Sequence, residues 1–465
     1  MSNICVVGAG YVGLVTAGCF ARLGHQVTCV DVNPQRVEDV NRDRLPVREP
    51  HLDALWRRSR RQGRLRATTD YARAVPGAAF IFVCVDTPAG GDGRADLRRV
   101  VEAAGSIAAH LPAGAAPVVA LKSTVPVGTA ELVRDVLAAC RPAGPVPPVV
   151  SNPEFLREGH AVSDFLRPAR VVVGAADEAA ARAVAALYEP LRRPVLFCDN
   201  RTAELIKYAS NAFLATKVSF INEIAELCES YGVDVTDVAR AIGMDARIGG
   251  AYLDAGLGWG GSCLPKDLAA LVAMAGAREV ASPLLSAVVE VNRRQPQRVV
   301  QRLRDLLGSL DGRTVAVWGL TFKPDCNDLR GSQALALIRL LEEQGCRVRA
   351  YDPAGMPAAA PLLPGVALAP DAYEAAAGAD AVVLATAWAE FRSLDFVRVA
   401  GLVRRPLLID GRNCLPVEAV LGAGFTYIGM GRHAEPVRPV EVGVPPELRE
   451  LAFPAAPSRP GRRLS

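Results

Sequence analysis

The residues best suited to chemistry lie in one glycine-rich segment, residues 256–267, which reads GLGWGGSCLPKD. Glycine has no Cβ, so this backbone can approach a ligand closely. If a helix begins near Pro265, Cys263 and Asp267 face one pocket, because residues four apart share a helix face. A thiol beside Lys266 and a helix start is expected to have a lowered pKa and to act as a nucleophile. The alternative is that Cys263 is a small buried hydrophobic side chain.

A second segment, residues 8–13 with the sequence GAGYVG, has the spacing of a dinucleotide-binding turn. It follows an apolar strand expected at Ile4–Val7 and precedes an apolar helix that extends to Leu23 and then a strand at Gln26–Val30. In this context the glycines let backbone amides reach a pyrophosphate. Asp31, directly after the second strand, is placed to bind the adenosine ribose and to repel a 2′-phosphate. The pattern therefore predicts NAD rather than NADP.

Three polar loops follow further apolar strands in the first half of the chain. The expected elements are strands at residues 79–85, 117–121, 149–151 and 170–173 and helices at residues 96–110 and 129–140. Such alternation predicts a doubly wound parallel sheet. The loops 86–88, 122–124 and 152–159 then line one crevice at the carboxyl ends of the strands. Each loop alone is also compatible with turn chemistry or a helix cap.

Two long helical patterns follow, at residues 202–231 and 267–294. Lys207 and Asn211 are four residues apart on the first helix and therefore share a face. Because their neighbours are largely apolar, a buried polar pair that faces a ligand competes with the simpler interpretation of a solvated stripe. A helical middle with more than one apolar side is also a natural dimerisation region.

A second α/β unit begins near residue 313 and repeats the plan of the first without its glycine turn. Its expected elements are strands at residues 313–320, 346–351, 381–385 and 407–409 and a helix at residues 332–344. A loop with Lys323 and Arg330 replaces the turn and suits anionic groups held by side chains.

The fold class is therefore α/β, with two Rossmann-like doubly wound domains joined by a long helical central region. We expect an NAD-binding domain at residues 1–200 and a central dimerisation region with the cysteine loop at residues 201–300. A second Rossmann-like domain should occupy residues 301–435. Residues 436–465 form a flexible tail, with disorder expected from residue 452 to the end.

Composition argues against several other classes of protein. Of the 465 residues 50% are hydrophobic and the net charge is +4, which does not suggest a nucleic-acid partner. The eleven cysteines contain no Cys-x-x-Cys pair and the five histidines are far apart, so we expect reduced thiols and no metal. No signal peptide or bilayer-spanning stretch is evident, which favours a cytoplasmic protein without a membrane partner.

Taken in order, these segments resemble the UDP-glucose/GDP-mannose dehydrogenase family from residue 1 to about residue 430. The resemblance rests on GAGYVGL at 8–14, NPEFLREG at 152–159, the helical segment 204–211, GGSCLPKD at 260–267, and FKP at 322–324 with Arg330. It implies a four-electron, NAD-dependent oxidation of UDP-glucose to UDP-glucuronate. The sugar C6 becomes an aldehyde, Cys263 adds to it, and a second oxidation gives a thioester that water cleaves.

Other activities remain open at this stage. Sister enzymes act on GDP-mannose or on a UDP-N-acetylhexosamine, and a two-electron NAD dehydrogenase with a structural Cys263 is a further alternative. A non-catalytic NAD-binding regulatory protein would be expected to lack Cys263 or Lys207, and both are present.

The resemblance also implies roles for individual residues. The implied catalytic residues are Cys263, Lys207, Asn211, Asp267, Thr124 and Glu154. The cysteine is the nucleophile, the lysine and the amide stabilise an oxyanion, and the last three position and deprotonate water. The implied NAD contacts are Gly8, Gly10, Tyr11, Val12, Gly13, Asp31, Arg36, Thr87, Thr124, Glu158, Lys266 and Arg330.

The implied UDP-sugar contacts are Glu154, Phe155, Leu156, Lys207, Asn211, Arg247, Tyr252, Gly256, Trp259, Gly260 and Lys323. Arg247 lies sixteen residues before the cysteine, and in the family such an arginine reaches across from the partner subunit. The expected partners are therefore a UDP-sugar and a second copy of the chain, in a homodimer or a larger homo-oligomer.

Overall fold

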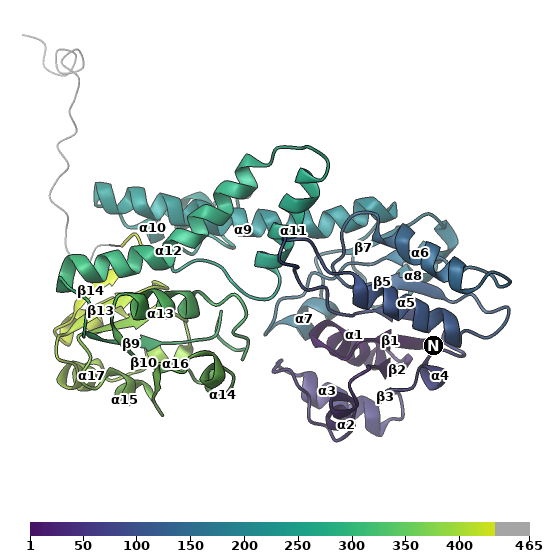
Figure 1. The fold of residues 1–465 in the computed structure, drawn as a ribbon, viewed down its shortest axis with the longest axis horizontal. Coiled ribbons are helices and arrows are strands. Elements are labelled where there is room, and N and C mark those ends of the chain that lie inside the picture. Colours follow the sequence, from purple (N-terminus) through teal and green to yellow (C-terminus); the bar gives the residue numbers. More distant parts are fainter. Residues whose placement is uncertain (433–465) are drawn as a thin grey trace, which may run out of the picture.

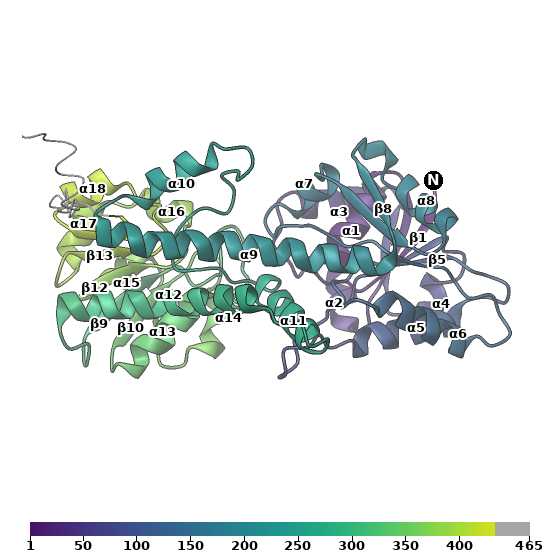
Figure 2. The same ribbon diagram turned by 90° about the horizontal axis from the view of Figure 1, so that it is seen from above.

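The computed structural model describes residues 1–432, and the tail expected from residue 436 lies outside them. The described chain forms two α/β units with helices between them (Figure 1). Helix α9 (Asn200–Tyr231) begins in the first unit and extends along the second (Figure 2). This arrangement confirms the predicted class, two Rossmann-like units joined by a helical centre.

The first unit is built on an eight-stranded sheet. Its strands, in spatial order, are β3 (Leu65–Thr68), β2 (Gln26–Val30), β1 (Asn3–Val7), β4 (Phe80–Val83), β5 (Val118–Leu121), β6 (Val149–Ser151), β7 (Val171–Ala175) and β8 (Val195–Cys198). The prediction of a fully parallel sheet is wrong at one pair, because β6 and β7 are antiparallel. The connection after β6 stays at the carboxyl edge and contains only the short helix α7 (Ala161–Leu166). The chain therefore re-enters the sheet from the edge at which it left.

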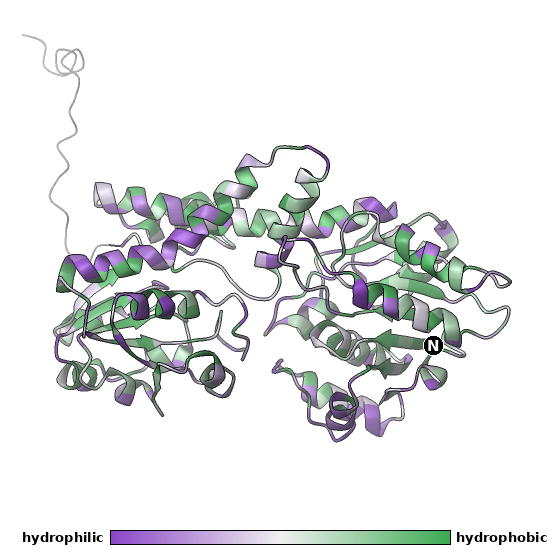
Figure 3. Ribbon diagram, in the orientation of Figure 1, coloured by the Kyte–Doolittle hydropathy of each residue, from purple (hydrophilic) through white to green (hydrophobic). Residues whose placement is uncertain are grey.

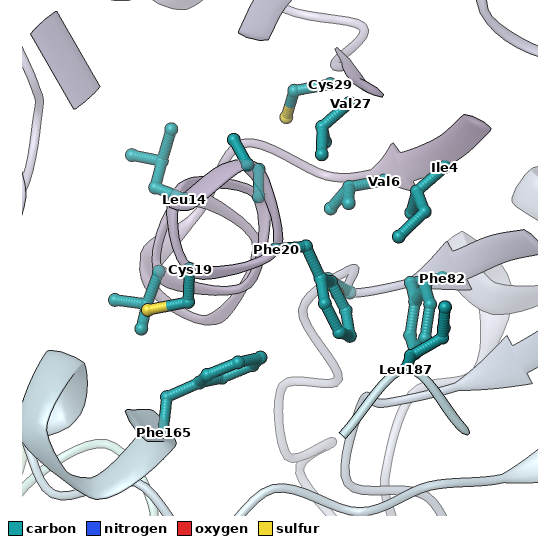
Figure 4. Close-up of a cluster of buried hydrophobic side chains, with 14 of the residues drawn as sticks. Ile4, Val6, Leu14, Cys19, Phe20, Val27, Cys29, Phe82, Phe165 and Leu187 are labelled. Atoms are coloured by element: carbon teal, nitrogen blue, oxygen red, sulfur yellow. The ribbon is translucent and has the colours of Figure 1, made fainter. Parts of the chain in front are cut away.

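Both faces of this sheet are covered, so successive residues of a strand enter two separate cores. On β1, Val6 joins one core and Val7 the other. In the first core the ring of Phe20 lies 4.9 Å from that of Phe82 and 5.2 Å from that of Phe165 (Figure 4). The helices of this unit are α1 (Tyr11–Arg22), α2 (Pro34–Asn41), α3 (Leu52–Arg61), α4 (Tyr71–Ala74), α5 (Arg98–His110), α6 (Thr129–Cys140), α7 and α8 (Glu178–Ala186).

The second unit has six parallel strands. In spatial order they are β11 (Ala367–Leu368), β10 (Arg347–Tyr351), β9 (Thr314–Trp318), β12 (Ala381–Leu384), β13 (Leu407–Asp410) and β14 (Thr426–Gly429). Its helices are α13 (Gln333–Glu343), α14 (Met356–Ala359), α15 (Ala372–Ala376), α16 (Ala389–Arg392), α17 (Phe396–Leu402) and α18 (Val417–Gly422). Buried Trp318 donates from Nε1 to the carbonyl of Ala372, which fixes α15 against β9.

The region between the units contains α9, α10 (Val235–Gly243), α11 (Leu264–Gly276) and α12 (Pro283–Leu307). The prediction of one helix over residues 267–294 is wrong, because the chain breaks between α11 and α12. Pro283 has no amide hydrogen and disfavours helical backbone at the residue before it, so a new helix begins there. Polar and apolar residues are mixed along α9, α10 and α12, whereas most strands of both sheets are hydrophobic (Figure 3).

Within residues 1–432, no helix combines the length and apolar character needed to cross a bilayer. The same residues hold no group of three or more His, Cys, Asp or Glu side chains arranged to bind a metal ion. All eleven cysteines lie in this range as free thiols.

Candidate functional site

A cavity of about 550 Å³ opens at the carboxyl edge of the first sheet. It is lined by the turn before α1, by loops that follow β4, β5 and β6, and by residues at the start of α11. The predicted site residues along it are Gly8, Gly10, Tyr11, Val12, Asp31, Arg36, Thr87, Thr124, Glu154, Leu156, Glu158, Cys263, Lys266 and Arg330. Cofactor residues and the thiol, which belong to separate motifs, thus share one cavity.

The turn between β1 and α1 fits the pyrophosphate of NAD. A Cβ on Gly10 would meet no atom within 4 Å, so the backbone there is open to the cavity. Gly13 has a packing role instead, because a Cβ at this position would lie 1.8 Å from the carbonyl oxygen of Gly8. The first amides of α1 carry partial positive charge, which favours an anionic ligand at this point.

Asp31 is held in place at the end of β2 before any ligand binds. Its Oδ2 accepts hydrogen bonds from the amide of Ala9 at 2.7 Å and from Arg36 Nη1 at 3.1 Å. The carboxylate is buried and lines the cavity, where it can accept ribose hydroxyls. Because Arg36 is engaged by this carboxylate, its charge is partly neutralised for a 2′-phosphate.

Cys263 is the residue directly before α11 and is half-buried in the cavity wall. Its pKa is raised, mainly by burial and further by Glu154, against the opposing effect of Lys207. The expectation of a lowered pKa is therefore wrong. The lysine and the helix start are present as predicted, but removal from water and nearby carboxylates outweigh them. Sγ lies 3.6 Å from Ser262 Oγ, a polar contact rather than apolar packing.

Asp267 brings the two halves of the expected catalytic group together. Its Oδ2 accepts a hydrogen bond from Asn211 Nδ2 at 2.6 Å, and its Oδ1 pairs with Lys266 Nζ at 2.5 Å. Asp267 is 1% exposed. Asp267 on α11 therefore holds the side-chain amide of Asn211 on α9 in place.

Lys207 forms a buried ion pair with Glu154, with Nζ 2.9 Å from Oε1. Burial opposes ionisation of Glu154, but Lys207 overcomes this effect and lowers the pKa of the carboxyl. For Lys207, burial lowers the pKa, but Glu154 raises it more strongly, so the pKa of the lysine is raised overall. Both groups are therefore charged at neutral pH. Lys207 and Asn211 are buried, so the interpretation of a solvated stripe is wrong.

Lys122 is a site residue that sequence reasoning named only as part of a loop. It is 4% exposed, and its Nζ donates to the backbone and side-chain oxygens of Asn152 at 3.3 and 3.2 Å. Burial lowers the pKa of Lys122 to about 8. A lysine directly after an apolar strand was the sequence feature that could have indicated a buried site residue here. In the same loop, the carbonyl of Thr124 accepts a hydrogen bond from Thr87 Oγ1 at 2.7 Å.

Glu204 on α9 was missed as a positioning residue. Its carboxylate accepts hydrogen bonds from the amides of Gly128 at 2.7 Å and Ala130 at 2.9 Å, at the start of α6. It therefore ties the helix that carries Lys207 to the loop that carries Thr124. The signal was a glutamate one helical turn before Lys207 in an apolar context.

The glycine segment approaches the second α/β unit rather than open ligand space. A Cβ on Gly260 would lie 2.1 Å from the carbonyl oxygen of Gly331, and a Cβ on Gly256 would lie 2.7 Å from that of Gly411. Trp259 is buried and donates from Nε1 to Ser219 Oγ at 2.9 Å. Its side chain thus packs between helices and holds the segment in place.

The remaining predicted substrate residues are not among the residues that line the cavity. Lys323 donates from Nζ to the backbone carbonyl of Glu158 and thereby joins the two units. The ring of Phe155 lies 3.8 Å from the Arg170 guanidinium. Tyr252 has a left-handed backbone with a φ of 66°. The structure does not bring Arg247 into this cavity: its side chain is 88% exposed and paired with Asp245.

Family models match the chain in three consecutive parts. Residues 2–192 match the NAD binding domain, residues 201–294 the central domain, and residues 316–417 the UDP binding domain of the UDP-glucose/GDP-mannose dehydrogenase family.

Individual relatives agree with this assignment. The UDP-glucose 6-dehydrogenase of Rhizobium meliloti is 46% identical over 92% of this chain and 99% of its own. TuaD, a UDP-glucose 6-dehydrogenase of Bacillus subtilis, is 41% identical over 97% of this chain and 98% of its own. A solved UDP-glucose dehydrogenase from Pyrobaculum islandicum has a TM-score of 0.87 at 40% identity, over 93% and 98% of the two chains. The chain therefore belongs to the UDP-glucose/GDP-mannose dehydrogenase family.

Proposed function

We propose that this protein is a UDP-glucose 6-dehydrogenase, which oxidises UDP-glucose to UDP-glucuronate through a thiohemiacetal and a thioester on Cys263. The observation that carries the proposal is that one cavity is lined by both the dinucleotide turn and Cys263. The names of the relatives support UDP-glucose as the substrate. Residues 1–200 would bind NAD, residues 201–300 would supply most of the catalytic groups, and residues 301–435 would hold the UDP portion.

The charged groups around Cys263 suit the chemistry. NAD, when bound, accepts hydride from the sugar carbon. Lys207 is protonated and can stabilise negative charge on the C6 oxygen, with the Asn211 amide beside it. Glu154 is ionised and can hold or deprotonate water with Thr124 and Asp267.

We further propose a homodimer formed along α9. Large apolar side chains are exposed on this helix at Leu205, Phe213, Phe220, Leu227 and Tyr231. They recur at intervals of eight, seven, seven and four residues. This spacing places them along one side of the helix and suits a second copy of the same face. A dimer would also carry Arg247 of one subunit towards the site of the other. We expect the protein in the cytoplasm.

A nucleotide-sugar panel tests the substrate assignment. Purified protein with NAD is supplied in turn with UDP-glucose, GDP-mannose, UDP-N-acetylglucosamine and UDP-N-acetylmannosamine, and NADH formation is followed by absorbance. The highest kcat/KM is expected for UDP-glucose, with Cys263→Ala as the control for turnover that does not need the thiol. A higher kcat/KM for GDP-mannose or for a UDP-N-acetylhexosamine would assign the chain to a sister activity.

A further inference from the structure

The Cys263 thiol needs a base, because its raised pKa leaves it protonated at neutral pH. The two carboxylates that raise the pKa of this thiol, Asp267 and Glu154, are already engaged. Asp267 accepts from Asn211 and Lys266 through its two oxygens. The oxygens of Glu154 are likewise occupied, one by Lys207 and the other by a backbone amide. Direct transfer of the thiol proton to either group would neutralise a carboxylate that is already paired with a lysine.

Ser262 offers a different path. Its Oγ lies 3.6 Å from Cys263 Sγ and donates a hydrogen bond to Glu158 Oε1 at 3.0 Å. A serine hydroxyl has one proton and two lone pairs. When its proton points to the carboxylate, a lone pair remains available for the S–H of the thiol. The three groups therefore form a continuous donor chain from sulfur to carboxylate.

We propose that Ser262 and Glu158 relay the proton that leaves Cys263 when the thiol attacks the sugar aldehyde. As the S–C6 bond forms, the S–H proton passes to Ser262 Oγ and the Ser262 hydroxyl proton passes to Glu158. The C6–O π bond becomes a C–O single bond, and its oxygen is stabilised by Lys207. The step needs no oxidant, and it rests on the thiohemiacetal of the proposed function.

The surroundings of Glu158 suit a proton acceptor. Burial is the main cause of its raised pKa, Asp328 adds to it, and Ser262, Arg330 and Lys323 oppose it. Arg330 Nη2 lies 3.9 Å from Oε1, and its stronger partner is Asp328 at 2.5 Å. Among residues 1–432, Glu158 therefore has no side-chain cation closer than 3.9 Å to its carboxylate. Its backbone carbonyl is held by Lys323, so the carboxylate is positioned by the second α/β unit.

Alkylation of the protein without NAD or sugar tests the relay apart from turnover. Iodoacetamide modification of Cys263 is followed by mass spectrometry between about pH 6 and pH 10, and exposed Cys140 is the internal control. Ser262→Ala and Glu158→Gln should each slow alkylation of Cys263 at neutral pH by about tenfold or more. Ser262→Thr keeps the hydroxyl and should react within about threefold of the unchanged protein. Cys140 should react equally in all of them.

The relay is overturned if either Ser262→Ala or Glu158→Gln leaves the Cys263 profile unchanged. It is also overturned if Ser262→Thr is as slow as Ser262→Ala, because the effect would then come from packing. Glu158→Gln carries the test alone if Ser262→Ala does not fold. A failed relay leaves the proposed function standing, since the number of NADH formed per sugar is measured separately.

Discussion

At the scale of single residues, the charged groups around Cys263 are paired before any ligand binds. Lys207 forms an ion pair with Glu154. Asp267 binds both Asn211 and Lys266. At the cofactor end of the cavity, Asp31 forms an ion pair with Arg36. Such pairing fixes side-chain positions and charge states in a buried site. Substitution of one member therefore acts on its partner as well as on the ligand.

Asp31→Ser should narrow the preference for NAD over NADP. The change removes the acceptor for ribose hydroxyls, removes repulsion of a 2′-phosphate, and frees Arg36 to bind that phosphate. We expect kcat/KM for NAD to fall and the ratio of NAD to NADP values to fall by about tenfold or more. The unchanged protein should prefer NAD, and equal use of both cofactors by it would contradict the role of Asp31.

At the scale of elements, the site depends on contacts between α9, α6, α11 and the second α/β unit. Glu204 joins α9 to the start of α6. The glycine segment before α11 passes against Gly331 and Phe322 of the second unit at distances that leave no room for side chains. These contacts hold the proposed catalytic groups from three elements in one geometry. Single changes at these contacts should therefore act on activity at a distance.

Gly260→Ala should lower kcat/KM for UDP-glucose by about 100-fold, because a shift of about 1 Å in catalytic groups has a cost of this size. The added Cβ would lie 2.1 Å from a backbone oxygen, so the segment before Cys263 has to move. Gly276→Ala is the matched control, since a Cβ there meets no atom within 4 Å. Similar activity in the two variants would show that the close approach does not position the thiol.

Glu204→Gln should change how stability depends on pH. Burial outweighs two amide hydrogen bonds and raises the pKa of Glu204 from 4.5 to about 7. Because the folded-state pKa is above the unfolded one, the stabilising contribution of proton binding is complete below about pH 4.5 and is lost as pH rises through 7. The unfolding free energy of the unchanged protein, relative to the variant, should fall by about 1 to 3 kcal/mol between about pH 5 and pH 8.

Urea unfolding at several pH values measures this difference. Glu178→Gln, at an exposed carboxylate on α8, is the control. Parallel curves for the unchanged protein and Glu204→Gln would contradict the raised pKa of Glu204.

Local patterns in the sequence predicted most of these elements, and the exceptions have physical causes. The inner strands of both sheets and the start of α11 follow from apolar runs and from Pro265, whereas the four edge strands, β3, β8, β11 and β14, were not predicted. Strand β7 is antiparallel because the connection after β6 remains at the carboxyl edge of the sheet. The path of this connection depends on tertiary packing, which no local sequence pattern predicts. The break before Pro283 was available from the sequence and was missed. The pKa of Cys263 depends on burial and on distant carboxylates, so the motif alone predicted the wrong direction.

At the scale of the whole molecule, both units and a second subunit are expected to complete the site. Lys323 and Arg330 come from the second unit and contact Glu158 of the first. Arg247 and large apolar side chains of α9 are exposed, and we propose that a second chain covers them. We therefore expect dimer formation to affect the enzymatic activity as well as the molecular mass in solution.

Mixed dimers test this contribution. Arg247→Ala should raise the KM for UDP-glucose by about tenfold or more while NAD affinity stays nearly unchanged. Cys263→Ala should be inactive on its own. When subunits of the two variants are exchanged, a mixed dimer contains one site with an intact thiol and the partner's Arg247, so activity at low substrate should return in part. No recovery in dimers shown to be mixed would exclude a role for Arg247 in the neighbouring site.

The most direct test of the proposed chemistry is the number of NADH molecules formed per sugar. With limiting UDP-glucose and excess NAD, the thioester route predicts two NADH per sugar, UDP-glucuronate as product, and no free aldehyde. Cys263→Ser should lose the overall reaction by several orders of magnitude, because a serine hydroxyl is a far weaker nucleophile, while NAD binding survives. One NADH per sugar from the unchanged protein, or two NADH per sugar at a near-normal rate from Cys263→Ser, would contradict covalent catalysis by Cys263.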